Sequence, residues 1–412
     1  MDSAEEMTIG DSDRDLALSL DPLLSPLAIR HLTLRNRFIV PSMQRGLSED
    51  GRPSAALAQY YGRFAQGGFG LVMSEACAID HPSAGQDGKV VRMTHLTATG
   101  WQQCVRAVEE GGAAMFVQLW HGGAMRKPEQ GQGNAHVDTI SPSGLVTAAQ
   151  PAGRAMVAAD FRSVLDAYVR SARLAQATGA KGVELHGCHG SLLDQFLWPS
   201  TNRRTDGYGG ADMESRVRFP AEVVGAIRAA VGPDLVISFR FSQWKQLDYE
   251  TGQIAAAPDE LACMLSQLRG AGVDIFHAST RRFERPEWAG SRLGLAGWTK
   301  RLTDAPVIAV GGVGSNIDLQ SLYNDAHAAR EAAIMPAGAI VRGSLKRLTG
   351  RFASGEFDLV AVGRAGIGDP EWVNKISTGR FDDVRMFQVD DLLLILAHFN
   401  KRVRAPAQVS VA

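Results

Sequence analysis

The sequence is poor in cysteine. Its four cysteines, Cys77, Cys104, Cys188 and Cys263, lie far apart and form no C-x-x-C motif. A disulfide framework, a zinc knuckle and an iron–sulfur cluster are therefore all unsupported. We expect four reduced thiols.

The sequence also lacks long apolar runs and net charge. No run approaches the roughly 20 apolar residues that span a bilayer. The acidic start lacks the basic and then apolar pattern of a secretory signal. With 43 basic and 44 acidic residues the net charge is −1, which argues against a nucleic-acid or anionic-membrane partner. We therefore predict a cytoplasmic protein with neither kind of partner.

What is present is an ordinary globular composition, with 412 residues of which 45% are hydrophobic and 21% charged. Apolar segments alternate with helical patterns. The expected strands are 38–42, 69–74, 114–120, 182–185, 235–241, 273–277, 306–310 and 358–362. The expected helices include 53–66, 99–110, 161–178, 214–231 and 259–271. Nearly all-apolar strands that alternate with helices indicate parallel strands buried on both faces.

Eight such units predict an α/β fold, a single closed (β/α)8 TIM barrel. An open doubly wound sheet would usually show a G-x-G-x-x-G turn after its first strand, and none is present. Residues 27–36 alternate as a small hairpin would, and the Gly-rich insertion 121–160 after the third strand is long enough to be a lid. We predict a disordered leader at 1–21, the barrel over 22–405 and a tail at 406–412.

In such barrels the functional site lies at the C-terminal ends of the strands. The residues at these ends are Pro41, Ser42, Met43, Gln44, Glu75, Ala76, Gln118, His186, His189, Arg240, Gly311, Gly312, Gly363 and Arg364. They include no convergent carboxylate pair and no nucleophile with a base, so hydrolase chemistry lacks its parts. No lysine lies at a strand end, which argues against a Schiff-base aldolase.

Glycines follow the last two strands. Gly311, Gly312 and Gly363 leave backbone N–H groups open to a phosphate, and Arg364 can bind it bidentately. The alternative is that these glycines form tight turns only. Arg281 and Arg282 end the sixth strand on the same side; they could meet an acidic substrate or a cofactor phosphate, or lie in a solvated loop.

The fourth strand ends in an H-x-x-H pair, His186 and His189. Such a pair could be half of a metal site, but no third ligand with suitable spacing follows. We therefore predict no metal. The two histidines could also be structural, and we interpret Cys188 between them as a small filler rather than a redox thiol.

Several motifs in order resemble the Old Yellow Enzyme family of FMN-dependent ene-reductases. They are the run Leu24–Arg37 (LSPLAIRHLTLRNR), Gln118-Leu-Trp, the H-x-x-H pair, Asn202–Gly210 (NRRTDGYGG) and Val362–Arg364 (VGR). The resemblance extends from about Pro22 to about Arg380. Each motif is weak alone, and together they are specific.

The resemblance implies an FMN cofactor with NAD(P)H as reductant. Gln118 and Arg240 match residues that meet the carbonyl and N1 edge of the isoalloxazine, and Ala76 matches a small residue beside the ring. The other implied FMN-binding residues are Pro41, Ser42, Met43, Gln44, Gly311, Gly312, Gly363 and Arg364. His186 and His189 match the pair that binds a substrate carbonyl oxygen, so that hydride from flavin N5 attacks the β-carbon of an activated alkene.

Two positions depart from the family pattern. Gln44 stands where the family usually has Thr or Cys beside the reactive edge of the flavin. Ser191 stands where a Tyr usually delivers the proton to the α-carbon. Proton delivery must then come from Ser191 itself, from water or from another side chain such as Tyr208, or it is absent.

These departures leave alternative functions open. A redox-neutral flavin isomerase and a non-catalytic flavoprotein that binds FMN and a ligand both remain. The implied partner is a small-molecule activated alkene. Homo-oligomerisation is also open, since Arg402 and Arg404 near the C-terminus could reach a neighbouring subunit.

Overall fold

The computed structural model describes the chain in several segments. The described residues are 9–85, 88, 90–128, 134–247, 252–315, 335–388 and 390–391. The predicted tail at 406–412, Arg402 and Arg404 lie outside them.

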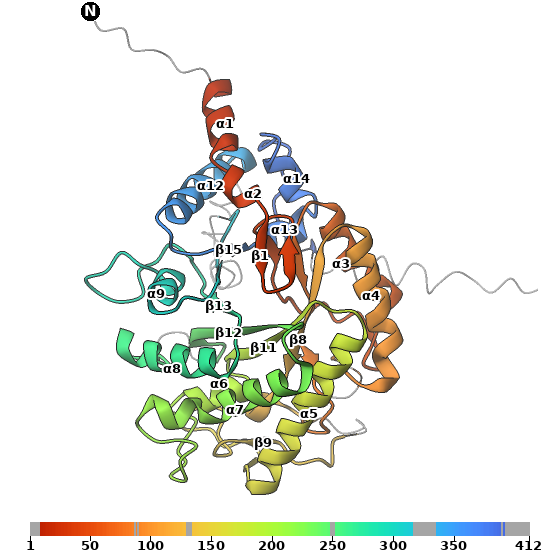
Figure 1. The fold of residues 1–412 in the computed structure, drawn as a ribbon, viewed down its shortest axis with the longest axis vertical. Helices are drawn as coiled ribbons and strands as arrows, with labels where there is room; N and C mark the ends of the chain where they lie inside the picture. Colours follow the sequence, from red (N-terminus) through yellow and green to blue (C-terminus); the bar gives the residue numbers. More distant parts are fainter. Residues whose placement is uncertain are drawn as a thin grey trace, which may run out of the picture.

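Parallel strands close into a barrel (Figure 1). The barrel strands are β3 (Phe38–Val40), β6 (Leu71–Met73), β8 (Ala114–Trp120), β11 (Gly182–His189), β12 (Val236–Lys245), β13 (Ile275–Ser279), β14 (Val307–Val310) and β15 (Leu359–Ala361). Their order is β11-β12-β13-β14-β15-β3-β6-β8, and β8 pairs back with β11 to close the ring. A short strand, β7 (Cys77–Ala78), also pairs with β8. The predicted (β/α)8 TIM barrel is confirmed.

Helices surround the strands (Figure 1). The longer ones are α3 (Ala55–Gln66), α4 (Ala98–Glu110), α5 (Ala158–Ala177), α7 (Met213–Val231), α8 (Pro258–Ala271), α9 (Leu295–Leu302) and α12 (Ala337–Ala353). The shorter ones are α2 (Asp21–Leu24), η1 (His95–Thr97), η2 (Gly123–Met125), α6 (Leu192–Leu197), α13 (Arg364–Gly368) and α14 (Trp372–Ile376). The helices expected from the sequence are confirmed to within a few residues at each end.

Local chemistry explains where the helices begin. The side chain of Ser54 accepts a hydrogen bond from the Leu57 backbone at the start of α3, and Asp212 does the same for Ser215 at the start of α7. Each such cap stabilises a helix by about 1 kcal/mol. In the described part of the chain, every helix is too short or too polar to cross a bilayer.

The fold has two apolar cores. One lies between the strands and the helices, and the other fills the barrel with side chains such as Leu71, Phe116, Ile275 and Ile308. Toward the C-terminal ends of β8, β11, β12 and β13 the side chains inside the barrel become polar. An apolar floor therefore supports a polar mouth, as in other barrels that carry a site at this end.

Smaller elements flank the barrel. The predicted hairpin forms as β1 (Leu27–Ile29) and β2 (Leu32–Leu34), and β4 (Ser48–Glu49) pairs with β5 (Arg52–Pro53). The insertion after β8 contains a parallel pair, β9 (Ile140–Ser141) and β10 (Arg154–Ala155).

Gln195 of α6 holds the base of this insertion. Its Oε1 accepts from the Ala124 backbone at 3.1 Å, and its Nε2 donates to the Gly190 carbonyl at 2.6 Å. The insertion is therefore tied to the turn that follows β11.

The disorder predicted for the leader does not hold over residues 9–18. These residues form α1 (Ile9–Leu18), and Asp13 accepts two hydrogen bonds at 2.6 Å from Arg342 of α12. Leu16 and Leu20 are buried in the outer core. Burial of these two apolar side chains offsets the entropy of ordering the segment.

Candidate active site

A polar cluster occupies the mouth of the barrel. Gln118, Glu184 and His277 are at most 1% exposed, and Arg240 is 8% exposed. Strand pairing sets Glu184 opposite Gln118, and Arg240 opposite both His186 and His277. Because residues opposite each other on neighbouring parallel strands point to the same side, these groups converge inside the barrel.

The amide of Gln118 is held in one orientation. Its Nε2 donates to Oε1 of Glu184 at 2.8 Å, and its Oε1 accepts from the Ser42 hydroxyl at 2.7 Å. The second N–H of this amide has no hydrogen-bond partner among the described residues. It is therefore available to the acceptor edge of a ligand.

Arg240 places a cation beside this amide. Its Nη1 lies 3.4 Å from the Ser42 carbonyl oxygen, and its Nη2 donates to the Ser279 hydroxyl at 3.2 Å. Within the described residues its buried Nε–H has no acceptor. A buried donor without a partner costs about 1–3 kcal/mol, which an acceptor on a bound ligand would relieve.

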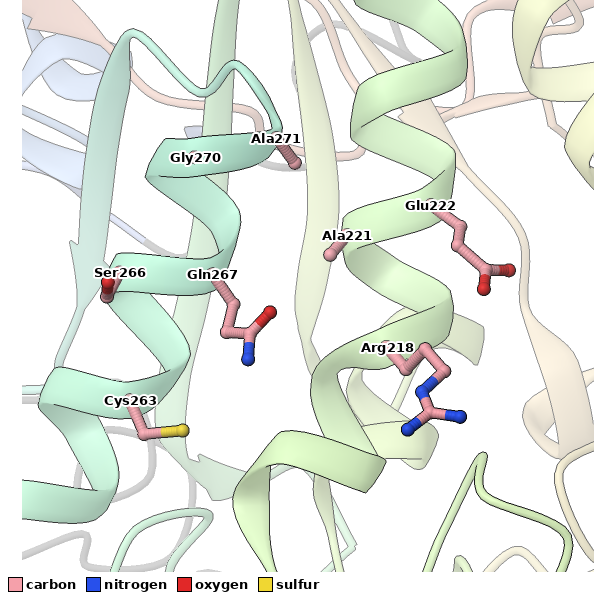
Figure 2. Close-up of a pocket in the computed structure, with 8 residues that line it drawn as sticks. All are labelled: Arg218, Ala221, Glu222, Cys263, Ser266, Gln267, Gly270 and Ala271. Carbon is pink, nitrogen blue, oxygen red and sulfur yellow. The ribbon is translucent and has the colours of Figure 1, made fainter.

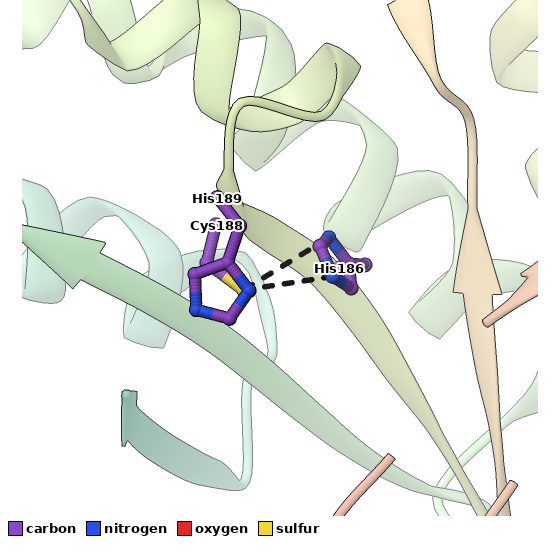
Figure 3. Close-up of side chains that lie close together, drawn as sticks. All are labelled: His186, Cys188 and His189. Carbon is purple, nitrogen blue, oxygen red and sulfur yellow. Dashed lines mark hydrogen bonds between the residues drawn. The ribbon is translucent and has the colours of Figure 1, made fainter. Parts of the chain in front are cut away.

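The histidine pair lies at the end of β11 (Figure 3). The imidazole centroids of His186 and His189 are 5.6 Å apart and the rings are nearly perpendicular, at 79°. His189 has a left-handed φ of 60°, and the register with β12 shifts between Gly187 and His189. This bulge redirects the strand end, and the ring of His189 stacks on Trp244 at a centroid distance of 4.2 Å.

A serine hydroxyl lies against one ring nitrogen of His189. Ser279 Oγ accepts from Arg240, so its own proton can go to Nε2 of His189, 2.9 Å away. A serine oxygen accepts up to two hydrogen bonds, so Ser279 can equally accept from an Nε2–H, and both tautomers of neutral His189 fit this network. When Ser279 donates to Nε2, the proton of His189 lies on Nδ1, which is then a donor for a ligand oxygen.

His186 shares a different hydroxyl. Ser191 Oγ lies 3.0 Å from Nδ1 of His186, 2.6 Å from the His186 carbonyl and 3.0 Å from the Cys188 carbonyl. Ser191 has a single hydroxyl proton. If Ser191 donates this proton to Nδ1, the ring proton of His186 lies on Nε2. If Ser191 donates it to a carbonyl, the ring proton can lie on Nδ1. The ring can therefore present either tautomer.

Both histidines are neutral at ordinary pH. Burial, with a smaller contribution from Arg240, lowers the pKa of His186 to about 3 and lowers the pKa of His189 well below its usual range. Neutral imidazoles can donate hydrogen bonds to a substrate oxygen without acting as strong acids.

Cys188 lies beside the pair, as Figure 3 shows. Its Sγ is 3.8 Å from Nε2 and 3.9 Å from Nδ1 of His186, and the closest ligand-type atoms of His186, Cys188 and His189 all lie within 4.8 Å of one another. Sequence spacing indicates no third metal ligand, yet the fold supplies a third group. Burial raises the pKa of the Cys188 thiol well above its usual range, which favours the protonated thiol.

The two candidate proton donors occupy very different places. Ser191 is 2% exposed and lies against His186. The Tyr208 hydroxyl donates to Glu222 at 3.1 Å, and its ring packs on Phe161. Glu222 is among the residues that line a cavity of about 560 Å³ between α7 and α8, outside the barrel; Figure 2 shows its side chain with the other lining residues. The Tyr208 hydroxyl is therefore engaged by Glu222 of α7, and proton delivery from it to a substrate stays a prediction.

The segment Pro41–Gln44 lies next to the end of β15. A Cβ placed on Gly363 would be 3.6 Å from both Met43 Sδ and Pro41 Cγ. Behind this segment, buried Glu75 accepts from the Arg45 backbone at 3.0 Å and fixes the turn. Gln44 is exposed and Ala76 is half-buried.

The glycines after β14 have a structural requirement of their own. Gly311 has φ 137° and a Cβ there would lie 2.6 Å from the Thr280 carbonyl oxygen, whereas Gly312 has φ 72° and its nearest neighbour, on Arg282, is 3.4 Å away. Both positions favour glycine. Arg364 is the first residue of α13, directly after Gly363, so the predicted phosphate-binding residues lie on adjacent barrel strands.

A cavity of about 280 Å³ adjoins the pair. It is lined by Trp244, Ser279, Arg281, Arg282, Arg285 and Glu287, among others. Trp244 and Ser279 both contact His189, so the cavity lies next to His189. Burial raises the pKa of Glu287 to about 7.

Sequence reasoning missed Glu184, Trp244 and the role of His277. The signal for Glu184 is present, because it is a charged residue in an apolar strand, two positions before His186 and hence on the same face. The contact between His189 and Trp244 depends on the bulge and has no sequence signal.

The donor set fits the flavin predicted from the sequence. An isoalloxazine presents carbonyl oxygens and a ring nitrogen along one edge, and the free N–H of Gln118 and the unpartnered Nε–H of Arg240 are donors for such an edge. The histidine pair adds neutral donors on the same side of the barrel.

Comparison with a family model gives a match over most of the chain. The model of the NADH:flavin oxidoreductase / NADH oxidase family matches residues 22–328. The chain is 33% identical over 380 residues to an NADH oxidase of Thermoanaerobacter brockii, covering 88% of this chain and 52% of the relative. It thus spans about half the length of that relative.

Shorter relatives and solved structures agree. A probable flavin mononucleotide-dependent alkene reductase of Leishmania infantum is 30% identical over 269 residues, covering 61% of this chain and 72% of the relative. Morphinone reductase is similar in structure, with a TM-score of 0.71, 25% identity and coverage of 90% and 92%. A structure of morphinone reductase in complex with tetrahydroNAD has a TM-score of 0.72, 25% identity and coverage of 90% and 93%.

Proposed function

The chain belongs to the NADH:flavin oxidoreductase / NADH oxidase family, and we propose that it uses NAD(P)H and FMN to reduce the activated C=C bond of α,β-unsaturated carbonyl compounds. Membership confirms the resemblance to the Old Yellow Enzyme family and the expectation of FMN with a nicotinamide reductant. The substrate class and the hydride route are the proposal.

One observation carries the proposal. Neutral His186 and His189 lie at the barrel mouth next to Gln118 and Arg240, the donors that fit a flavin edge. A carbonyl compound held by the pair would lie beside the cofactor. Bound FMN would supply hydride from N5 to the β-carbon of the alkene.

The chain's own residues hold and polarise the substrate in this proposal. When Ser279 donates to Nε2 of His189, the Nδ1–H of that ring donates to the carbonyl oxygen of the substrate. His186 adds a second donor when the Ser191 proton is on its Nδ1. Preorganised donors stabilise the negative charge that develops on that oxygen as hydride arrives.

The cavity beside the pair supports a finer proposal about the substrate. Arg281, Arg282 and Arg285 line it, and Arg282 already donates to Glu284 at 3.0 and 2.6 Å. Because this lining is cationic, we propose that the cavity holds a remote carboxylate or phosphate of the alkene. Guanidinium groups bind such anions bidentately.

The alternative of a redox-neutral isomerase keeps its support. Tyr208 is engaged outside the barrel and the Ser191 hydroxyl lies against backbone carbonyls. Net reduction would then draw from water the one proton that the α-carbon takes after hydride transfer. An isomerase would instead return to the substrate a hydrogen taken from that same molecule, with no net reduction.

Turnover with 2-cyclohexenone separates these functions. Reduction predicts NAD(P)H consumption that depends on the enone and yields cyclohexanone. Activity with His189→Ala should fall about 100-fold or more, since removing one preorganised donor costs 10²–10³ in rate. Conversion of an enone to its isomer without NAD(P)H consumption would favour the isomerase, and no conversion of either kind would favour a binding protein.

The remaining predictions stay proposals. We propose that the barrel domain extends over 22–405, that FMN is held by the residues named above, and that the protein is cytoplasmic. A gel-filtration measurement would decide whether it forms homo-oligomers.

A further inference from the structure

Glu184 is a carboxylate buried at the centre of the barrel. It is 0% exposed and accepts three hydrogen bonds, from Gln118 Nε2 at 2.8 Å, Ser238 Oγ at 3.1 Å and His277 Nδ1 at 2.7 Å. A buried carboxylate persists only where donors or charges compensate it. Neither the histidine pair nor the glycine-rich turns need this group for their own geometry.

The surroundings keep Glu184 ionised. Burial alone would raise its pKa, but its partner His277, followed by Arg240 and Gln118, lowers the pKa of Glu184 below its usual range. Arg240 is one of the groups that lower this pKa, and it is also the cation expected at the flavin edge. Glu184 therefore opposes the very charge that would stabilise an anionic reduced flavin.

His277 is the closest partner of this carboxylate. It is 0% exposed, and because its Nδ1–H donates to Glu184, the other ring nitrogen is an acceptor. That nitrogen, Nε2, has no donor among the residues that the structure describes. An unpartnered buried acceptor level with Arg240 on the neighbouring strand points toward a ligand or water at the barrel mouth.

We propose that Glu184 and His277 form a buried pair that orients the Gln118 amide and lowers the reduction potential of the bound FMN. The inference rests on the proposed flavin site but not on the substrate. Both residues are positioning residues, since they act through Gln118 and Arg240. The negative charge of Glu184 disfavours the reduced, anionic flavin relative to the oxidised one.

The test is the midpoint potential of bound FMN in the holoenzyme, measured with a reference dye and no alkene. Glu184→Gln keeps the shape and removes the charge. We expect the ratio of the affinity for reduced FMN to that for oxidised FMN to be at least tenfold higher in this variant than in the wild type. This corresponds to a positive shift of the midpoint potential of about 30 mV for a two-electron couple. A rise in this affinity ratio below threefold, or a negative shift of the midpoint potential, would overturn the proposal.

Two controls separate charge from packing. Ser238→Ala removes a hydrogen bond to the same carboxylate, and His277→Asn keeps an N–H donor near the position of Nδ1. Each should change the relative affinity less than threefold. If either shifts the potential as much as Glu184→Gln does, loss of packing rather than charge is responsible and the proposal fails.

A second measurement reports directly on the charge of Glu184. The infrared difference spectrum between oxidised and reduced wild-type protein should show an ionised carboxylate band that shifts on reduction, and Ser238→Ala should move that band. A protonated carboxyl band in its place would overturn the proposal. Failure to reduce enones would leave both results standing, whereas wild-type protein that cannot be loaded with FMN would overturn both proposals.

Discussion

Single hydroxyl groups control the chemistry of the histidine pair. Ser279 links Arg240 to His189, and Ser191 links His186 to the backbone of its own turn. Each hydroxyl can donate to its imidazole or accept from it, so two tautomers of each ring are accessible. The sequence motif gives the positions of the histidines but not the location of their protons. Those depend on hydroxyl contacts that form only in the fold, such as the contact of His189 with the distant Ser279.

Ser191→Ala tests whether this serine delivers the proton. Its hydroxyl lies 2.6 Å from the His186 carbonyl, so we expect it to orient the imidazole rather than protonate the substrate. The rate constant kcat for enone reduction should fall less than tenfold, by steady-state kinetics. A loss above 100-fold, with FMN still bound, would show that Ser191 delivers the proton.

Arg285→Gln tests whether the cavity beside the pair takes an anionic group. Arg285 is exposed and lines this cavity. We expect kcat/KM to fall about tenfold, roughly 1.4 kcal/mol, for an enone that carries a carboxylate, with little change for 2-cyclohexenone. Equal losses for both substrates would contradict the proposal, and a loss of FMN affinity would indicate that the cavity serves the cofactor phosphate.

Strands and helices were largely predictable from the sequence because buried parallel strands have a strong apolar signal. The strand expected at 182–185 instead runs to His189, and the one expected at 235–241 runs to Lys245. Both extensions carry polar residues that only tertiary contacts make part of a strand. The same contacts created the parts of the site that sequence reasoning missed, such as the stacking of His189 on Trp244.

The turn after β14 offers a matched pair of stability tests. Gly311→Ala would put a Cβ 2.6 Å from the Thr280 carbonyl oxygen, whereas Gly312→Ala meets nothing closer than 3.4 Å. Both residues have positive φ, which costs a non-glycine residue about 1–3 kcal/mol. In urea unfolding, Gly311→Ala should therefore lose more free energy of unfolding than Gly312→Ala. The opposite order would contradict the turn geometry.

At the scale of the whole molecule, buried neutral histidines link stability to pH. Burial lowers the pKa of His277 below its usual value and that of His121 well below it. Between the folded and unfolded pKa values the unfolded chain binds more protons, so stability rises with pH.

The free energy of unfolding should therefore fall as pH drops below about 6.5, by up to about 1.4 kcal/mol per pH unit for each such histidine. Because the pKa of Glu184 is lowered in the folded protein, the free energy of unfolding should fall further below about pH 4.5, the ordinary pKa of a glutamate. Urea unfolding between pH 8 and 5 measures the first effect. His121→Gln should reduce the slope of the free energy of unfolding against pH. An unchanged slope would contradict the lowered pKa of His121.

Metal removal tests a further global property. Although Cys188 joins the histidine pair, we predict that no metal is needed. Dialysis against EDTA should leave enone reduction and the flavin spectrum unchanged. A loss that Zn²⁺ restores in the wild type but not in Cys188→Ser would contradict this.

The central claim is that one site passes hydride from NAD(P)H through FMN to an alkene. The most direct measurement is anaerobic: the visible flavin absorbance is followed as NAD(P)H and then 2-cyclohexenone are added to the holoprotein. The account predicts bleaching by NAD(P)H and full return with the enone, together with one equivalent of cyclohexanone. Bleaching that the enone cannot reverse would contradict alkene reduction.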